Sequence, residues 1–436
     1  MTKAPAVWLT TLGCAKNQVD SDKLEARLDA SGYRRAASPE VADVVMVNTC
    51  AFIEAARRES IDTILDHADR KQPEARLVVL GCMAQRYQSD LAEALPEADA
   101  VLGMERYGEL IADLDRLTGW EPIRLTTSPM DILYEVRRPT PSTPYAYVKV
   151  AEGCDKTCSF CAIPQFRGKQ RSRPPVGIRE EIAGLAAAGV AEIVLVAQDL
   201  AAYGRDIDAP GGIVDLLRFI SDIEGLRRLR LLYLYPREIT PALIEEMAGN
   251  DTIAPYFDLS LQHASGRLLR AMRRPGDGDR HLELIGSIRR AAPDAAFRSS
   301  FIVGFPGETE RDVDRLEAFL IAAELDWAGF FPYSAEEGTP AADLPDQVDA
   351  VAAAERTRRL QDLQEGITAS RSAEQVGRVL ELVVDQVEDG TPVARSYREA
   401  PEIDGVVLLD HGVPGQWLQA RIRAAYGSDL TAEVVG

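Results

Sequence analysis

Short apolar runs alternate with amphipathic stretches along the first 130 residues of the chain. Val7–Thr11, Val44–Val47 and Leu77–Leu80 have the length and composition of strands. Helical patterns follow from about Asp20 and through Ile53–Leu65. Such alternation predicts parallel βαβ units. The loops after parallel strands meet at the carboxyl edge of an open sheet, so a ligand site is expected at that edge.

The same alternation continues, with longer periods, through the middle of the chain. Six further strands are predicted, at Tyr145–Val150, Glu192–Ala197, Leu229–Leu234, Phe257–Leu261, Ala296–Val303 and Trp327–Tyr333. Helices are expected between them, including Gly177–Ala188, Pro241–Ala248, His281–Ala291 and Glu310–Ala323. Six βα units predict a partial TIM-like (β/α)6 barrel whose site lies at the carboxyl ends of the strands.

The last part of the chain changes to a strand-rich pattern. A charged helix over about Ala352–Ala373 precedes five short segments separated by Gly, Pro and Asp. Five short strands within about 60 residues predict a small OB-like β-barrel. The prolines from Pro139 to Pro144 are typical of a linker. The chain is therefore an α/β protein with predicted domains at 1–130, 145–370 and 375–436 and a linker at 131–144.

Composition indicates a soluble globular protein. Of the 436 residues, 46% are hydrophobic and 27% are charged. We find neither the apolar run of a signal peptide nor a stretch of about 20 apolar residues, so the sequence predicts a cytoplasmic protein and no membrane partner. Disulfides are rare in that reducing compartment, and clustered cysteines there more often bind metal or catalyse.

The net charge of −20 lacks the basic footprint of most nucleic-acid-binding proteins. An acidic chain either keeps a well-solvated surface or meets a basic partner. Charge alone leaves both interpretations open, but it weighs against an RNA-binding scaffold.

Three of the six cysteines form a Cys-x3-Cys-x2-Cys triplet at Cys154, Cys158 and Cys161. Cysteine thiolates are the usual ligands of iron–sulfur clusters. Three ligands for a 4Fe–4S cluster leave one iron open, as a metal that performs chemistry requires. A zinc ribbon would need a fourth nearby Cys or His, which the sequence does not provide.

The other three cysteines, Cys14, Cys50 and Cys82, each follow one of the first three predicted strands. They are therefore expected at one edge of one sheet. An electron carrier with two ferredoxin-like clusters would need eight cysteines, and the chain has six. The cysteine count therefore weighs against such an electron carrier.

The triplet, with Phe160 before its last cysteine, resembles the cluster motif of the radical S-adenosylmethionine (SAM) superfamily. The resemblance implies that the open iron chelates SAM. One electron then cleaves SAM to methionine and a 5′-deoxyadenosyl radical. In such enzymes the cofactor performs the radical chemistry, while the protein orients and shelters the reactants.

Motifs along the whole chain are similar to those of the methylthiotransferase family. They comprise Thr11-Leu12-Gly13-Cys14 with Asn17, Asn48-Thr49-Cys50, Gly81-Cys82, Ala197-Gln198-Asp199, Leu261-Gln262-His263 and Phe301 to Thr309. The resemblance implies a second 4Fe–4S cluster at Cys14, Cys50 and Cys82, which supplies the methylthio sulfur, and a TRAM domain at the end of the chain. Two molecules of SAM would be used, one for methylation and one for the radical.

Several further residues are candidates for cofactor contacts. Gln198 and Glu308 stand at predicted strand ends and fit SAM contacts, although such residues also cap helices. Gly304 would permit a tight turn near the ligand, and Phe160 accompanies the triplet. Leu200 stands where the resemblance leads us to expect a threonine. Beyond the cluster ligands, the sequence indicates no catalytic residue.

A basic run follows the triplet, which is unusual in an acidic chain. It consists of Arg167, Lys169, Arg171 and Arg173. These residues either form a solvated loop or neutralise the charge of a cluster, of SAM or of the substrate. Both interpretations remain open.

Two features bear on the substrate. The segment Leu12 to Asn17 with Val19-Asp20-Ser21 resembles the branch that modifies small-subunit ribosomal protein S-twelve. From Gln375 to Gly436, ten acidic residues stand against five arginines, a net charge of −5, which suits a basic protein. The resemblance implies methylthiolation of an aspartate β-carbon, with a reducing electron donor as a further partner. The alternative is a 2-methylthiotransferase acting on N6-isopentenyl or threonylcarbamoyl adenosine of tRNA.

Overall fold

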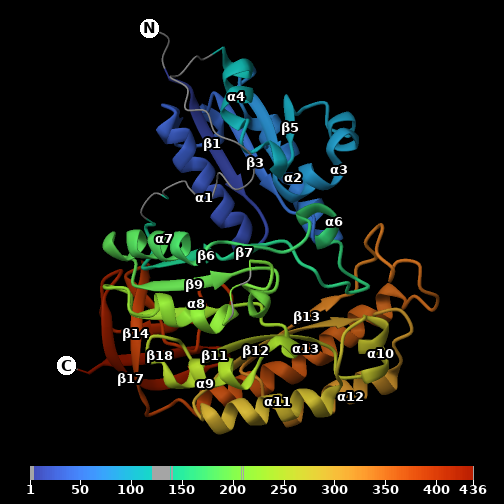
Figure 1. Cartoon of the computed structure of the whole chain (residues 1–436), viewed down its shortest axis with the longest axis vertical. Coiled ribbons are helices and arrows are strands. Elements are labelled where there is room, and N and C mark those ends of the chain that lie inside the picture. Colours follow the sequence, from blue (N-terminus) through green and yellow to red (C-terminus); the bar gives the residue numbers. More distant parts are fainter. Residues whose placement is uncertain (1–3, 120–137, 139–140, 208, 210, 436) are drawn as a thin grey trace. The chain divides into compact units, whose positions relative to one another are not determined.

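The computed structural model describes residues 4–119, 138, 141–207, 209 and 211–435, and the chain forms two compact units (Figure 1). Unit 1 comprises Met1–Pro139 and Ala162–Lys169, and unit 2 comprises Thr140–Cys161 and Gln170–Gly436. The predicted linker lies largely outside the described residues. The radical-SAM-like and terminal segments therefore share one unit, while the predicted domain boundaries stay predictions.

Unit 1 is built on a five-stranded parallel sheet in the order β2-β1-β3-β4-β5. Its strands are β1 Ala6–Thr11, β2 Arg34–Arg35, β3 Val44–Thr49, β4 Arg76–Leu80 and β5 Ala100–Leu102. Its helices are α1 Ala15–Ala30, α2 Glu54–Arg70, α3 Gly81–Ala94, α4 Leu110–Thr118 and α6 Ile163–Arg167, with 3-10 turns η1 Pro39–Val41 and η2 Met104–Arg106. All six residues of β3 are buried, as expected for a central parallel strand. The predicted parallel α/β fold is confirmed.

Unit 2 contains six parallel strands in two three-stranded sheets, β10-β9-β6 and β11-β12-β13. A bridge between Leu234 and Leu259 connects them. The strands are β6 Tyr145–Lys149, β9 Glu192–Val196, β10 Arg228–Leu231, β11 Tyr256–Gln262, β12 Ala296–Val303 and β13 Trp327–Pro332, with a small ladder of β7 Ala151–Glu152 and β8 Arg171–Ser172. The predicted partial barrel is confirmed.

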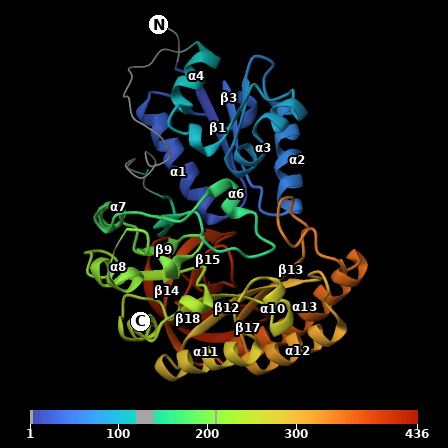
Figure 2. The ribbon, with the colours of Figure 1, turned by 45° about the vertical axis from the view of Figure 1, so that its right-hand side comes forward.

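Helices cover the outer side of these strands, with α11, α12 and α13 alongside β11, β12 and β13 (Figures 1 and 2). The helices are α7 Pro175–Ala187, α8 Gly212–Ile220, α9 Pro241–Gly249, α10 Gly266–Ala271, α11 Gly278–Ala291, α12 Glu310–Ala323 and α13 Ala350–Ala373, with 3-10 turns η3 Leu200–Ala202 and η4 Pro236–Glu238. Thr309 and Asp312 form a capping box at α12, which satisfies backbone N–H groups that the helix start leaves unpaired.

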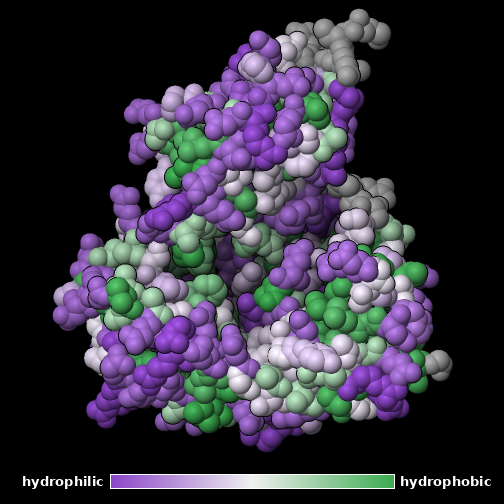
Figure 3. Space-filling view, turned by 180° about the vertical axis from the view of Figure 1, so that it is seen from behind, coloured by the Kyte–Doolittle hydropathy of each residue, from purple (hydrophilic) through white to green (hydrophobic). Residues whose placement is uncertain are grey.

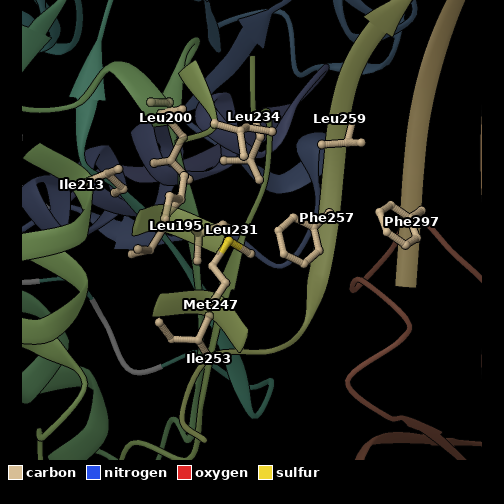
Figure 4. Packing of buried hydrophobic residues seen from close by; sticks show 14 of the residues in the cluster. Leu195, Leu200, Ile213, Leu231, Leu234, Met247, Ile253, Phe257, Leu259 and Phe297 are labelled. Atoms are coloured by element: carbon tan, nitrogen blue, oxygen red, sulfur yellow. The ribbon is translucent and has the colours of Figure 1, made fainter. Parts of the chain in front are cut away.

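Apolar side chains from neighbouring strands meet inside unit 2 (Figure 4). Leu195, Leu231 and Leu259 come from successive strands, and the rings of Phe257 and Phe297 stack with centroids 5.9 Å apart. Burying one such side chain contributes about 1.5–3 kcal/mol. This packing fixes the strands whose carboxyl ends present the site.

The end of the chain closes into a five-stranded barrel in the order β14-β15-β16-β18-β17, as predicted. Its strands are β14 Val379–Glu388, β15 Thr391–Arg395, β16 Val407–Leu409, β17 Trp417–Tyr426 and β18 Asp429–Val434. Tyr145 and Tyr147 in β6 donate hydrogen bonds to the loop after β15, at Glu402 (2.9 Å) and the Pro401 carbonyl (3.0 Å). The terminal barrel is therefore fastened to the larger barrel by buried polar contacts.

The face in Figure 3 carries mainly hydrophilic side chains, with hydrophobic ones in small separate patches. Within the described ranges, the structure contains no helix long and apolar enough to cross a membrane.

Candidate active site

The first cysteine triad lies at the carboxyl edge of the unit 1 sheet. Cys14, Cys50 and Cys82 follow β1, β3 and β4, as the sequence predicts. Gly13 has φ +91°, and a Cβ there would meet Sγ of Cys50 at 2.9 Å. The glycine therefore allows two cysteine loops to approach each other closely.

Burial and nearby cations act in opposite directions on these thiols. Burial alone would raise the pKa of Cys14, but the charges of Lys16 and Arg167 lower it below its usual value. Burial raises the pKa of Cys82 to about 12, against the opposing charge of Arg167. Burial also raises the pKa of Cys50. A bound metal, which demands thiolates, would oppose this effect.

Asn17 connects the three cysteine loops. Its Nδ2 donates to the carbonyls of Leu12 (2.9 Å) and Thr49 (3.0 Å), which flank Cys14 and Cys50 in sequence. Its Oδ1 lies 3.5 Å from Sγ of Cys82. The motif asparagine therefore has a structural role that the cysteine spacing alone does not reveal.

The second triad, Cys154, Cys158 and Cys161, lies in the loop after β7 and is partly exposed. Ser159 anchors this loop, because its hydroxyl donates to the Ala271 carbonyl at 2.7 Å and its N–H donates to the Met272 carbonyl at 3.1 Å. The loop is thus held against the end of α10.

Two basic residues lie close to thiols of this triad. Burial raises the pKa of Cys154 to about 11, against the backbone N–H of Lys156, which donates to Sγ at 3.4 Å, and against the charge of the Lys156 side chain. Nη1 of Arg274 lies 3.5 Å from Sγ of Cys158. Both cations lie over the ring of Tyr235, with Nζ of Lys156 4.6 Å and the guanidinium carbon of Arg274 4.2 Å from its centroid. These cations offset negative charge where a cluster would bind.

A polar cavity of about 120 Å³ adjoins the second triad. It is lined by Asp155, Lys156, Gln170, Asp199, Ala202, Arg205 and Asp206. Asp199 is 2% exposed and lies 3.3 Å from Nζ of Lys156. Burial raises the pKa of Asp199. Within the described part of the chain, its carboxylate oxygens find no other hydrogen-bond partner, so this buried acid is available to a cationic ligand.

Among the predicted SAM contacts, Gln198 is hydrogen-bonded to Glu152, two residues before Cys154. Its Nε2 donates to Glu152 at 2.8 Å, and Glu152 pairs with Nζ of Lys149 at 2.6 Å. Its buried Oε1 has no partner among the described residues. Phe160 packs against the apolar cluster that contains Phe305.

Glu308 and Gly304 face α13. Glu308 accepts from the Gly304 N–H and from Arg356, both at 3.0 Å, and lies 3.4 Å from Nε2 of His263. A Cβ on Gly304 would meet that of Ala353 at 2.6 Å. These contacts fix the loop after β12, and the assignment of both residues as SAM contacts stays a prediction.

The sequence interpretation missed three residues at the second triad: Lys156, Asp199 and Arg274. Asp199 stands within a quoted motif, but only its burial beside Lys156 distinguishes it from a capping residue. Leu200, the departure from the expected threonine, is fully buried in the apolar core (Figure 4). Its side chain therefore packs inward, away from the polar cavity.

Comparison with known proteins places these sites in a family. The model "Uncharacterized protein family UPF0004" matches residues 6–103, the radical SAM superfamily matches 148–320, and the TRAM domain matches 376–435. Relatives named ribosomal protein uS12 methylthiotransferase RimO occur in Streptomyces griseus (41% identity, covering 99% of this chain and 98% of the relative) and Moorella thermoacetica (44%, covering 96% and 97%). The chain belongs to the RimO family of radical SAM methylthiotransferases.

Solved structures agree with the fold of this RimO family member. The radical SAM methyltransferase TsrM from Kitasatospora setae has a TM-score of 0.56 at 16% identity, covering 78% of this chain and 75% of its own. The cobalamin-dependent radical enzyme OxsB has a TM-score of 0.51 at 12% identity, covering 83% and 56%. At these identities the likeness concerns the fold alone.

The residues of this RimO family member fit the iron–sulfur cluster and SAM that radical SAM membership implies. Across the described ranges, no group of three or more His, Cys, Asp or Glu could hold a single metal ion. The three thiolates of a cluster bind different irons, so they stand farther apart than the ligands of one ion. Free thiols, neighbouring cations and a buried carboxylate beside the second triad together suit a cluster and SAM.

Proposed function

We propose that this chain transfers a methylthio group to the β-carbon of an aspartate in ribosomal protein uS12, in the cytoplasm, using two 4Fe–4S clusters and an external electron donor. The observation that carries the proposal is the division of six cysteines into two triads, one in each unit. Two sites with three ligands each suit two separate tasks, whereas one radical SAM cluster would need only Cys154, Cys158 and Cys161.

When bound, the cluster at the second triad and SAM supply a carbon-centred radical, and the first cluster supplies the sulfur. The chain's own residues orient and shelter these groups. Ser159 holds the loop of the second triad, and the side-chain charges of Arg274 and Lys156 offset its negative charge. Asp199 would bind the amino group of SAM, and Arg205 would attract its carboxylate at the same cavity.

The charge of the terminal barrel supports a protein substrate over tRNA. Arg395 and Arg398 are buried, at 1% and 2% exposure, and pair with carboxylates, so they cannot reach phosphates. Two arginines are exposed, Arg421 and Arg423, against five exposed carboxylates, at positions 388, 389, 402, 410 and 433. A negatively charged surface attracts a basic protein and repels RNA.

A direct comparison of substrates tests the proposal. The reconstituted protein, SAM and a reductant are incubated with uS12 or with tRNA that carries N6-isopentenyl or threonylcarbamoyl adenosine. We expect uS12 alone to gain the mass of a methylthio group in place of hydrogen, with the change on an aspartate. Gain on the tRNA alone would establish the alternative. Cys154→Ala protein, which should leave both substrates unchanged, is the control.

Asp199→Asn should weaken SAM binding about 10- to 100-fold, because a hydrogen bond to a charged group is worth about 1.5–3 kcal/mol. The dissociation constant of SAM is measured by equilibrium dialysis at matched iron content. Asp206→Asn is the control, since Asp206 lines the same cavity but already accepts from the Ser172 N–H (2.7 Å) and hydroxyl (2.6 Å). Equal SAM affinity in wild type and Asp199→Asn would exclude this role.

A further inference from the structure

The segment after the second triad belongs to unit 1. Cys161 is the last residue of unit 2 before Ala162–Lys169, which packs with the first sheet and its helices. Ala162 and Phe166 are buried in the apolar cluster of unit 1, and α6 contacts α3. The chain thus passes directly from a ligand of the second triad into the body that holds the first.

This segment places a buried guanidinium at the first triad. Arg167 is 4% exposed, and its Nη2 donates to Sγ of Cys82 at 3.0 Å and to Oδ1 of Asn17 at 2.7 Å. Its Nη1 lies 3.7 Å from Oδ2 of Asp20. The contact with Asn17 also connects Arg167 to the loops of Cys14 and Cys50.

A cation in this position acts on any cluster that the three thiolates hold. Hydrogen bonds to ligand sulfurs and nearby charge set the reduction potential of an iron–sulfur cluster. A buried positive charge stabilises the reduced form, which carries one more electron, and low polarity strengthens this interaction. The carboxylate of Asp20 and the amide of Asn17 fix the guanidinium rather than leave it mobile.

We propose that Arg167 is a positioning residue for the cluster at Cys14, Cys50 and Cys82, and that it raises the reduction potential of that cluster and slows its loss of iron. The inference rests on the proposed function, because it assumes a cluster at the first triad. Arg167, the first residue of the basic run at positions 167–173, would thus neutralise cluster charge rather than form part of a solvated loop.

The test uses full-length protein in which Cys154, Cys158 and Cys161 are replaced by alanine, so that only the first cluster is present. Arg167→Gln and Arg167→Lys are introduced into this background, and the cluster potential is measured by redox titration with electron paramagnetic resonance. We expect Arg167→Gln to make the potential more negative and to speed iron removal by a chelator about 10-fold or more. Arg167→Lys keeps the charge, so its cluster potential and its rate of iron loss should lie between those of Arg167→Gln and the parent.

Arg70→Gln is the matched control, because Arg70 is an exposed arginine at the far end of α2 and pairs with Asp66. It should leave potential and iron release unchanged. Equal potentials in the parent and both Arg167 variants would overturn the inference, as would an equal shift in Arg70→Gln. If Arg167→Gln holds no cluster, the test uses Arg167→Lys alone: a potential more negative than that of the parent supports the inference, and an equal potential overturns it. A parent that binds no iron would instead refute the cluster at Cys14, Cys50 and Cys82, and with it the proposed function.

Discussion

Cys82→Ala protein is expected to go on cleaving SAM while forming no methylthio product. Cys82 belongs to the first triad in unit 1, whereas SAM cleavage depends on the three cysteines of unit 2. A cluster with only two protein ligands would not assemble stably, so the variant should carry about half the iron of wild type. 5′-Deoxyadenosine and methylthiolated uS12, measured in the same reaction, separate the two activities.

Two control variants accompany Cys82→Ala, one expected to lose both products and one expected to keep them. Cys154→Ala should abolish both products, because without the radical no hydrogen leaves the substrate. Ser89→Ala, at an exposed position in α3 beyond its kink at Gln88, should retain both. Full methylthio transfer by Cys82→Ala would contradict the division of labour between the triads. Loss of SAM cleavage together with transfer would show that the first triad is needed for radical formation as well.

The elements that could be predicted from the sequence are those with local signals. The apolar run of β3 located that strand, because a central parallel strand is buried on both faces. The β-barrel at the end of the chain followed from five short strands and their turns. The six cysteines were identified by spacing and by their position after strands. The two- and three-residue strands β2 and β5 are too short to give a periodic signal.

Residues that act through distant partners escaped the sequence interpretation. Arg167 reads as part of a basic loop, and only the fold brings it to Cys82, 85 positions earlier. A helix boundary was also misplaced: α1 begins at Ala15, five residues before the predicted start. Its N-cap residue is Cys14, whose side chain makes no capping hydrogen bond, so the sequence carries no usual start signal there. Glu192 and Arg395 appear as ordinary charges in two strands, although they meet across 203 positions in a buried pair. Tertiary contact alone creates these environments.

Glu192→Gln is expected to destabilise unit 2 by about 3–5 kcal/mol, since removing one partner of a buried ion network leaves the others uncompensated. Glu192 is fully buried at the start of β9. It faces three buried arginines: Arg230 at 3.0 Å, Arg395 at 3.0 Å and Arg228 at 3.5 Å. Arg395 comes from the terminal barrel, so the loss should loosen that barrel from the larger one. Chemical denaturation at neutral pH measures the change, and Glu245→Gln, a surface substitution on α9, is the control.

The pH dependence gives this prediction a second, independent readout. Burial alone would raise the pKa of Glu192, but the charges of Arg395, Arg230 and Arg228 outweigh it and lower the pKa to about 2. A carboxyl whose pKa is lower in the folded state binds fewer protons there, so its contribution is complete above its ordinary pKa of about 4.3. It is lost as pH falls from there toward 2. In the apo chain, the stability gap between wild type and Glu192→Gln should therefore narrow over this interval. A gap that stays constant from pH 6 to pH 2 would show that Glu192 acts through shape rather than charge.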